Sequence, residues 1–522
     1  MTAAPSGRSH TQRLILEQLG QMLVVASGFL DRLLLTALLL RRWDISTFEA
    51  WSACIALSAT VSLFELGFNL YFNNQLMIEM ERGDRAAFLK TYSVGNSLFA
   101  CSAVGGFALL VGLIFFAEPL GAHADSRVAL TAIVLCGANS AKIALCAVYA
   151  LYRANRDYAR FAAIQGVSEI TRIACVIAAV ALGADLLDAA VTSAIATTFV
   201  AVAFVVLDTR HRYFPHAYAF RIPHRSDVRG ILGISTLYMA QAVPLMMYAS
   251  LPVIVLQKMA LAPGLLASFV LIRTLANVAR TPLQSVGIVM GQEAGRRIAV
   301  ADLDGARRVM ETSGRLFAVV SGLTSGLLLA GGEILTRYWT GSRELFDGPL
   351  MVAAAMPMIL TPVAVLSHNV LSSYQAPILP AIARWVQFGV TVIAYLFMPQ
   401  QSPPIRMMAA LSLGEIIGYA PVAYWATSRL VPGAGWKFHS WNLSLVVAST
   451  IFGATITHFS LALVSPLGDA ARLMSFAAVG SIFALSVLFV GVDADGRRRL
   501  IDQTIAPLRR RLFPSSTTRR RM

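Results

Sequence analysis

Charged side chains are scarce in this sequence. Asp, Glu, Lys and Arg make up 14% of the 522 residues, whereas 57% of the residues are hydrophobic. Soluble domains carry roughly 25% charged residues, so this composition excludes a soluble enzyme and a disordered chain. Cysteine is scarce too: all five cysteines lie inside apolar runs, and none forms a CxxC pair. This usage argues against a disulfide scaffold and against metal chemistry.

The sequence also lacks the motifs of catalysis and nucleotide binding. It contains no catalytic triad, no metal-ligand cluster and no Gly-rich phosphate loop. We therefore expect neither an enzyme, nor a cofactor, nor a transporter driven by ATP. Long loops are missing as well, because the longest gap between apolar blocks, 208–229, has only about twenty residues. That absence counts against glycan polymerases and ligases, which generally rely on a sizeable extracytoplasmic loop.

What the sequence has in abundance is apolar blocks of about 20 residues, the length at which a helix spans a bilayer. These blocks predict an all-α polytopic membrane protein with about 14 transmembrane helices. Their approximate cores are 19–40, 51–72, 93–117, 127–151, 161–182, 188–207, 230–256, 264–291, 314–335, 349–368, 379–398, 405–427, 441–464 and 471–492.

Two short internal matches indicate a duplicated architecture. Segment 63–69 can be laid on 271–277, and 98–100 on 316–318, which equates the second and third spans with the eighth and ninth. We therefore expect two six-helix lobes followed by two additional spans. The expected divisions are a cytoplasmic N-terminal tail 1–18, an N-lobe 19–207, a basic cytoplasmic linker 208–229, a C-lobe 230–428, two additional spans 440–492 and a basic cytoplasmic tail 493–522.

The net charge of +15 mainly indicates how the chain sits in the membrane. With the N-terminus placed in the cytoplasm, 28 of the 43 Lys and Arg residues fall on the cytoplasmic side and 8 on the opposite side. Positive residues accumulate on the cytoplasmic side of membrane proteins. We therefore expect a multi-pass protein of the cytoplasmic (inner) membrane with both termini in the cytoplasm. The Arg-rich tail follows the same rule or contacts anionic lipids, and no nucleic-acid partner is expected.

Ionisable residues inside the apolar blocks are the informative ones. Each costs roughly 2.5–3.5 kcal/mol to insert, so it usually faces a cavity or a partner. Arg315 and Arg384 lie nearer the cytoplasmic ends of their predicted spans. Their aliphatic side chains are expected to extend until the guanidinium groups reach the membrane–water interface. The deeper residues are Asp31, Arg32, Glu65, Lys142, Glu169, Arg172, Arg273, Arg280 and Glu415.

The eighth block carries the clearest polar pattern. Arg273, Asn277, Arg280 and Gln284 are spaced by 4, 3 and 4 residues, which places them on one stripe of a helix. Two cations on one face are tolerated beside water or an anionic ligand, which favours a cavity wall. The alternative is that each arginine pairs with an acid on a neighbouring helix.

The second block shows a similar stripe with an acid. Its polar residues follow helical spacing and are Ser58, Ser62, Glu65, Asn69 and Asn73. Glu65 either pairs with Arg273, or carries a proton, or acts as a conformational latch.

The remaining deep charges have simpler interpretations. Glu169 and Arg172 are three residues apart, so we expect them to neutralise each other as a structural pair. Lys142 joins Arg32 among the candidate cationic groups of a cavity. Asp31 and Glu415 are further candidates for coupling or latching, and a neutral, hydrogen-bonded carboxyl is the simpler interpretation of Glu415.

Glycine and proline residues occur within several of the predicted spans. Prolines inside a span remove a helical hydrogen bond and bend the helix, and glycines four residues apart predict close helix packing. The prolines are Pro244, Pro252, Pro282, Pro357, Pro362 and Pro421, and the glycine pairs are Gly287/Gly291, Gly322/Gly326 and Gly414/Gly418.

Several short segments carry a family likeness: Phe48-Glu49-Ala50-Trp51-Ser52 leading into Phe64-Glu65-Leu66-Gly67-Phe68, Asn73-Asn74-Gln75-Leu76 followed by Arg82-Gly83-Asp84, residues 269–277, and Tyr338-Trp339-Thr340-Gly341. Through them, and through the number and grouping of its spans, the chain resembles one branch of the multidrug/oligosaccharidyl-lipid/polysaccharide exporter superfamily. This branch is the polysaccharide transporters, to which the O-antigen flippases belong.

The resemblance implies a flippase that moves polyprenyl-diphosphate-linked oligosaccharide units to the outer leaflet, through a cavity that opens alternately to each side. It implies the lipid bilayer and other proteins of polysaccharide assembly as partners. In the related peptidoglycan-precursor flippases, arginines in the first and eighth spans hold the cargo. Arg32, Arg273 and Arg280 are their equivalents by span, whereas the second block departs from that pattern because it offers Glu65 and no arginine.

Two other functions stay open at this point. A drug or cation antiporter of the same superfamily needs an acidic cavity, whereas the mid-membrane residues sum to a charge of +1. A membrane scaffold or an enzyme of glycan assembly is the third candidate, for which the lone Glu415 is a weak catalytic signal.

Overall fold

The computed structural model describes residues 20, 23–65, 67–116, 125–155, 157–212, 220–259, 261–342, 344–373, 378–399, 401–433 and 435–491. The predicted tails 1–18 and 493–522 lie outside the described residues, as do positions 213–219 of the predicted linker.

Every regular element in the described ranges is helical, which confirms the predicted all-α class. The N-terminal half contains η1 (Leu30–Leu35), α2 (Thr36–Arg42), α3 (Ile45–Ala59), η2 (Thr60–Glu65), α4 (Phe68–Arg82), α5 (Arg85–Phe116), α6 (Ser126–Ala144), α7 (Cys146–Ala154), α8 (Tyr158–Ala181) and α9 (Leu186–Arg212). The C-terminal half contains α10 (Arg225–Lys258), α11 (Leu265–Ala299), α12 (Leu303–Thr340), α13 (Gly348–Leu360), α14 (Ala364–Ser373), α15 (Ile378–Phe397), α16 (Pro403–Leu413), η3 (Gly414–Tyr419), α17 (Ala420–Leu430), α18 (Trp436–Leu463), η4 (Ser465–Leu467) and α19 (Asp469–Gly491).

Each predicted apolar block coincides with one or more of these helices, but fewer of them qualify as membrane spans. Within the described ranges, 10 helices are long and apolar enough to cross a membrane, and α13 with α14 forms an eleventh candidate bent by 56°. Helices α9, α11 and α19 each include side chains outside the described set and are not among these candidates, so the expected count of about fourteen stays a prediction.

The second predicted block is broken rather than continuous. Between η2 and α4, Gly67 has a φ of 70°, a left-handed conformation that glycine adopts without steric cost. The polar stripe predicted from Ser58 to Asn73 therefore does not lie along one helix, and that expectation is wrong.

Two prolines near the bend between α13 and α14 leave backbone carbonyls without their helical donors, because proline has no N–H to offer the carbonyl four residues earlier. Pro362 leaves the carbonyl of Met358, and the Ser321 hydroxyl of α12 donates to it at 2.5 Å. Pro357 leaves the carbonyl of Ala353, which accepts from the Ser412 hydroxyl of α16 at 2.6 Å. Neighbouring helices thus supply the hydrogen bonds that hydrocarbon cannot.

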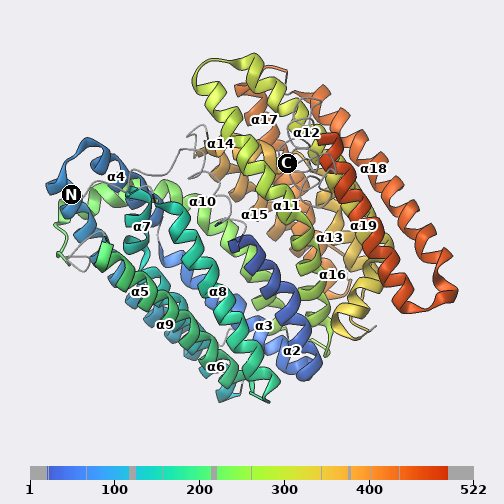
Figure 1. Cartoon of the computed structure of the whole chain (residues 1–522), viewed down its shortest axis with the longest axis horizontal. Coiled ribbons are helices and arrows are strands. Elements are labelled where there is room, and N and C mark those ends of the chain that lie inside the picture. The colour runs from blue at the N-terminus through green and yellow to red at the C-terminus, as the bar shows by residue number, and fades with distance from the viewer. Residues whose placement is uncertain are drawn as a thin grey trace, which may run out of the picture. The chain divides into compact units, whose positions relative to one another are not determined.

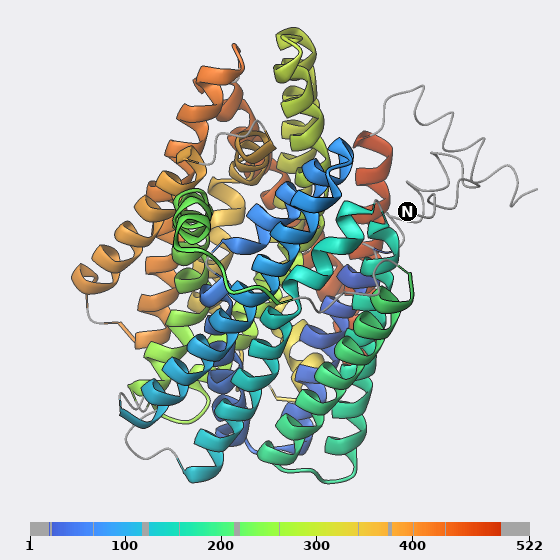
Figure 2. The ribbon, with the colours of Figure 1, turned by 90° about the vertical axis from the view of Figure 1, so that its left-hand side faces the viewer.

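The chain divides into two compact units. The first comprises Met1–Val278, Leu335–Ala354 and Gln375–Ala423, and the second comprises Ala279–Ile334, Ala355–Tyr374 and Tyr424–Met522. In the first unit, α9 packs against α6 and α8, and these helices run side by side in Figure 1 and Figure 2. In the second unit, α18 lies beside α19, as Figure 1 shows. The lobe boundaries at 207 and 230 stay a prediction.

The glycine pairs mark close helix contacts, as predicted. A Cβ on Gly326 of α12 would lie 2.5 Å from the backbone of Thr450 and Ala454 in α18. A Cβ on Gly418 of η3 would lie 2.8 Å from Cα of Gln387 in α15. At these positions two helix backbones meet with no room for a side chain.

The turn between the first two candidate spans is fixed by Asp44, which precedes α3. Its carboxylate accepts hydrogen bonds from the hydroxyls of Ser46 and Thr47, and from the backbone N–H of Thr47 at 3.3 Å. These bonds hold the pKa of Asp44 below its usual range, and the hydrogen bond from the Ser46 hydroxyl has the largest effect. Such capping sets where α3 begins.

Candidate functional site

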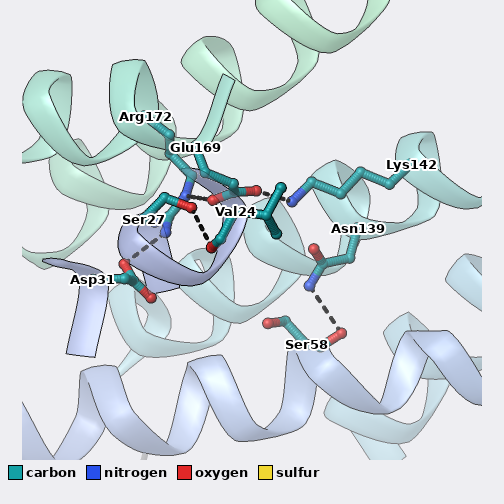
Figure 3. Close-up of polar contacts among 8 residues, drawn as sticks. All are labelled: Val24, Ser27, Asp31, Ser58, Asn139, Lys142, Glu169 and Arg172. Carbon is teal, nitrogen blue, oxygen red and sulfur yellow. Dashed lines mark hydrogen bonds and ion pairs between the residues drawn. The ribbon is translucent and has the colours of Figure 1, made fainter. Parts of the chain in front are cut away.

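Four charged side chains of the first unit form a continuous series of ion pairs (Figure 3), which we call the ionic chain. Lys142 Nζ lies 3.0 Å from Glu169 Oε1, and Arg172 Nε lies 2.7 Å from Glu169 Oε2. A terminal nitrogen of Arg172 then lies 2.6 Å from Asp31 Oδ1. The four formal charges alternate in sign and sum to zero.

Three helical segments position the ionic chain. Glu169 and Arg172 stand one turn apart on α8, and their predicted pairing is confirmed. Asp31 lies in η1, a π-helical turn within the span Leu23–Arg42. Lys142 lies near the end of α6, where Asn139 anchors the helix by donating to the backbone carbonyl of Ser58 at 3.1 Å (Figure 3). The ionic chain therefore joins the first, fourth and fifth predicted spans.

Burial differs along the ionic chain. The side chain of Arg172 is 12% exposed and that of Glu169 is 26% exposed, whereas Lys142 and Asp31 at the two ends are 37% and 38% exposed. The centre is thus held inside the protein, while both ends are partly exposed. Arg32, next to Asp31, is exposed and forms no ion pair with any residue that the structure describes.

Glu65 belongs to a separate polar group at the break between η2 and α4. The Cys146 thiol donates to Glu65 Oε1 at 3.4 Å, and Asn69 is a second hydrogen-bond partner of this carboxyl. Asn73 in turn donates to Asn69 Oδ1 at 2.7 Å. The suggested ion pair between Glu65 and Arg273 is absent among the described contacts, because Glu65 is bonded to neighbours within its own helical bundle.

Arg273 binds the backbone of α10 at a proline. Its two terminal nitrogens donate to the carbonyls of Tyr248 and Ala249, each at 2.7 Å. Pro252 has no N–H to give to the carbonyl of Tyr248, four residues earlier. The guanidinium therefore replaces the missing helical donor, and it also lies 5.8 Å from the ring centroids of Tyr248 and Phe269.

This contact predicts that Arg273 and Pro252 are energetically coupled. Replacing Arg273 by alanine leaves the partly buried carbonyl of Tyr248 without a donor, which should cost about 2 kcal/mol of stability. In a Pro252→Ala background the restored backbone N–H serves the same carbonyl, so Arg273→Ala should cost at least about 1 kcal/mol less. Melting curves in detergent, followed with a thiol-reactive dye on the buried Cys54 and Cys136, measure both costs.

Pro244, on the same helix, is the matched control. A Pro244→Ala background frees no donor for the carbonyl of Tyr248, so the cost of Arg273→Ala should stay at its full value there. Equal costs in the Pro252→Ala and Pro244→Ala backgrounds would contradict this assignment.

The rest of the predicted polar stripe follows along α11. The helix is unbroken from Leu265 to Ala299, so the spacing does place the four polar residues on one helical stripe. Asn277 and Gln284 are exposed and Arg280 is partly buried. Arg273 and Asn277 belong to the first unit, and Arg280 and Gln284 to the second.

Glu415 and Arg384 are held by neighbouring side chains in the first unit. Glu415, in the π-helical turn η3, is buried and accepts a hydrogen bond from the Tyr248 hydroxyl at 3.3 Å. The sequence led us to expect that Arg384 extends to the membrane interface, but it does not. It lies 4.1 Å from the ring centroid of Tyr419 and donates to Gln387 Oε1 at 2.8 Å, because the ring and the amide offer an inward partner for the charge.

One polar contact was not anticipated from the sequence. Glu49 of α3 accepts hydrogen bonds from the backbone N–H groups of Gly264 and Ala267, each at 3.0 Å, so its carboxylate caps the start of α11. Negative charge at a helix N-terminus is stabilising. The only sequence signal was an acid at the beginning of the second block, within the segment Phe48-Glu49-Ala50-Trp51-Ser52.

The described part of the chain offers no group of three or more His, Cys, Asp or Glu side chains that could hold a metal ion. The five cysteines are free thiols.

The sequence matches no protein-family model and no curated protein. Its fold matches solved structures. Lipid II flippase MurJ in an inward closed conformation aligns with a TM-score of 0.65 and 13% identity, over 91% of this chain and 99% of that chain. An inward-facing multidrug resistance MATE family transporter of the MOP superfamily aligns with a TM-score of 0.61 and 12% identity, over 80% and 97%. A mutant of the Vibrio cholerae MATE transporter VcmN gives 0.53 and 13%, over 80% and 96%.

At these identities the likeness concerns the fold. The chain shares the fold of these solved structures, one of which is described as a transporter of the MOP superfamily. These structures are described as a flippase of lipid II and as a multidrug resistance transporter.

Proposed function

We propose that this protein is a flippase that translocates polyprenyl-diphosphate-linked oligosaccharide units across the cytoplasmic membrane by alternating access. The product serves surface polysaccharide synthesis, such as O-antigen, lipopolysaccharide or exopolysaccharide assembly. Both termini are placed in the cytoplasm by the distribution of Lys and Arg. The fold shared with a lipid II flippase supports a lipid-linked cargo.

The observation that carries this proposal is the polar stripe on α11. Two arginines, Arg273 and Arg280, lie on an unbroken helix of membrane-spanning length. A diphosphate carries negative charge and cannot cross hydrocarbon unaided. Arg suits phosphate better than Lys does, because its planar guanidinium donates two parallel hydrogen bonds.

We assign roles to the remaining candidate residues as well. Arg32 and Lys142 add positive charge, and Asn277 and Gln284 offer amides for the phosphate or the sugar. The acids Asp31, Glu65 and Glu415 are assigned to ion coupling or to latching of a conformation.

Arg280 gives the cleaner test of the anion site, since Arg273 also supports the backbone of α10. Arg280→Ala should lower the export of surface glycan at least tenfold at normal protein level, because the cargo phosphate loses a charged partner. Arg280→Lys should retain part of the export. Arg308→Ala, on an exposed position of α12, is the matched control and should export normally. Full export in both Arg280→Ala and Arg273→Ala would remove the anion site from the proposal.

A drug or cation antiporter is the second candidate, and the fold shared with MATE transporters favours it. The two functions separate in a deletion strain. Loss of surface glycan with unchanged drug tolerance supports the flippase, whereas increased drug sensitivity with intact glycan supports the antiporter.

A further inference from the structure

We propose that Glu169 is a built-in substitute for the phosphate of the cargo, and that the cargo binds by displacing Glu169 from Lys142. This inference rests on the proposed flippase function and specifies how its site is regulated. The ionic chain is then an anion-binding site that the protein itself occupies when no cargo is present.

The contacts of Glu169 support this assignment. One carboxylate bridges two cations: Lys142 binds its Oε1 at 3.0 Å and Arg172 binds its Oε2 at 2.7 Å. A phosphate group offers oxygen acceptors to the same two donors, since ammonium and guanidinium groups recognise carboxylates and phosphates alike. The donor set of the ionic chain is therefore suited to a phosphate.

Energetics give a second reason. Charged networks removed from water are weak sources of stability, because desolvation offsets much of the attraction, and apolar residues of similar size often stabilise a protein equally well. Placing four charges from three predicted spans in contact is thus poorly explained by stability alone. A role in exchanging partners explains both the alternation of charge and the open ends.

The burial pattern indicates which cation is released. Arg172 is 12% exposed and keeps Asp31 as a second partner at 2.6 Å, whereas Lys142 is 37% exposed and has Glu169 as its ion-pair partner. When an incoming phosphate takes Lys142, Glu169 stays bound to Arg172. The exchange thus needs one ion pair to break while the other holds the chain in place.

Self-occupation lowers the apparent affinity of the site for every anion. A ligand must compete with a tethered carboxylate, so its apparent dissociation constant equals the intrinsic constant divided by the fraction of sites that Glu169 leaves free. Small anions such as inorganic phosphate then bind poorly. A lipid-linked diphosphate, which is also held by other contacts, still displaces the carboxylate.

The test is the binding of farnesyl diphosphate to the purified full-length protein in detergent, measured by isothermal titration calorimetry. Glu169→Gln frees Lys142 while keeping the shape of the side chain, so it should tighten binding about tenfold. Lys142→Gln should weaken binding about tenfold, and Lys142→Arg should restore it. Farnesol, which has no phosphate, should show none of these differences.

Asp185→Asn is the matched control. It frees Arg127 from an ion pair of similar length, 2.7 Å, whose two side chains are 66% and 43% exposed. Its affinity for farnesyl diphosphate should equal that of the unmodified protein. Melting curves establish that each variant is folded. If Glu169→Gln does not fold, the affinity of Lys142→Gln for farnesyl diphosphate tests the inference instead.

The outcomes separate the two ideas. Tight binding by the unmodified protein, with the same affinity in Glu169→Gln and Lys142→Gln, would overturn this inference and leave the flippase proposal standing. Absence of binding by the unmodified protein and by a folded Glu169→Gln would count against the flippase proposal as well. Tighter binding in Asp185→Asn would show that any released cation suffices and would also overturn the inference.

Discussion

Replacing Gly326 by alanine should destabilise the second unit by about 3 kcal/mol. The added Cβ would lie 2.5 Å from the carbonyl oxygen of Thr450 and from the backbone nitrogen of Ala454. Both atoms belong to the backbone of α18, so no flexible side chain can move aside and the whole helix must shift. The apparent melting temperature of the purified protein in detergent measures the loss.

Gly105→Ala is the matched control for this substitution. A Cβ at Gly105 of α5 meets nothing within 4 Å, and alanine is the better helix former by up to about 1 kcal/mol. This variant should melt at the same temperature or slightly higher. An equal effect of both substitutions would mean that the contact between α12 and α18 is looser than the structure has it.

Replacing Arg172 by methionine should be the most damaging change within the ionic chain. It leaves Asp31 without an ion-pair partner and removes one of two partners from Glu169. Removing one partner of a buried ion pair costs 3–5 kcal/mol, so about 3 kcal/mol is expected here, where Asp31 is 38% exposed. The same melting assay measures this loss.

Two further variants test the cause of that loss. Adding Asp31→Asn to Arg172→Met removes the unpaired acid and should recover part of the stability. Arg127→Met breaks an exposed ion pair with Asp185 and should change stability by less than about 1 kcal/mol. If Arg127→Met is as damaging as Arg172→Met, burial is not what makes the ionic chain sensitive.

The sequence predicts those elements and contacts that depend on residues close together along the chain. Glu169 and Arg172 are one helical turn apart, so their pairing follows from helix geometry once α8 is recognised. The glycine pair containing Gly326 likewise predicts a close contact, although it leaves the partner helix α18 open. The apolar blocks predict the helices for the same reason, because membrane length and hydropathy are local properties.

Partners far apart in the sequence cannot be read from spacing. Lys142 meets Glu169 across 27 positions and Arg172 meets Asp31 across 141. Glu49 caps α11 from 215 positions away. These contacts depend on how the helices pack, which no periodicity encodes.

Two local features of the sequence point to contacts that the structure shows. Pro252 inside a span indicates that the carbonyl of Tyr248 lacks its helical donor, and Arg273 is a donor that needs an acceptor. Gly67 likewise marks a place where a left-handed residue can end one helix and begin another. An intramembrane proline therefore predicts an unpaired carbonyl, although it leaves open which polar residue of another span pairs with it.

The carboxylate of Glu49 joins two segments that lie far apart along the chain. It belongs to α3 and accepts hydrogen bonds from the backbone N–H groups of Gly264 and Ala267 at the start of α11. Each hydrogen bond to a charged group is worth about 1.5–3 kcal/mol, so the two together contribute about 3–6 kcal/mol. Any rearrangement that separates α3 from the first turn of α11 therefore has to supply these two N–H groups with another acceptor.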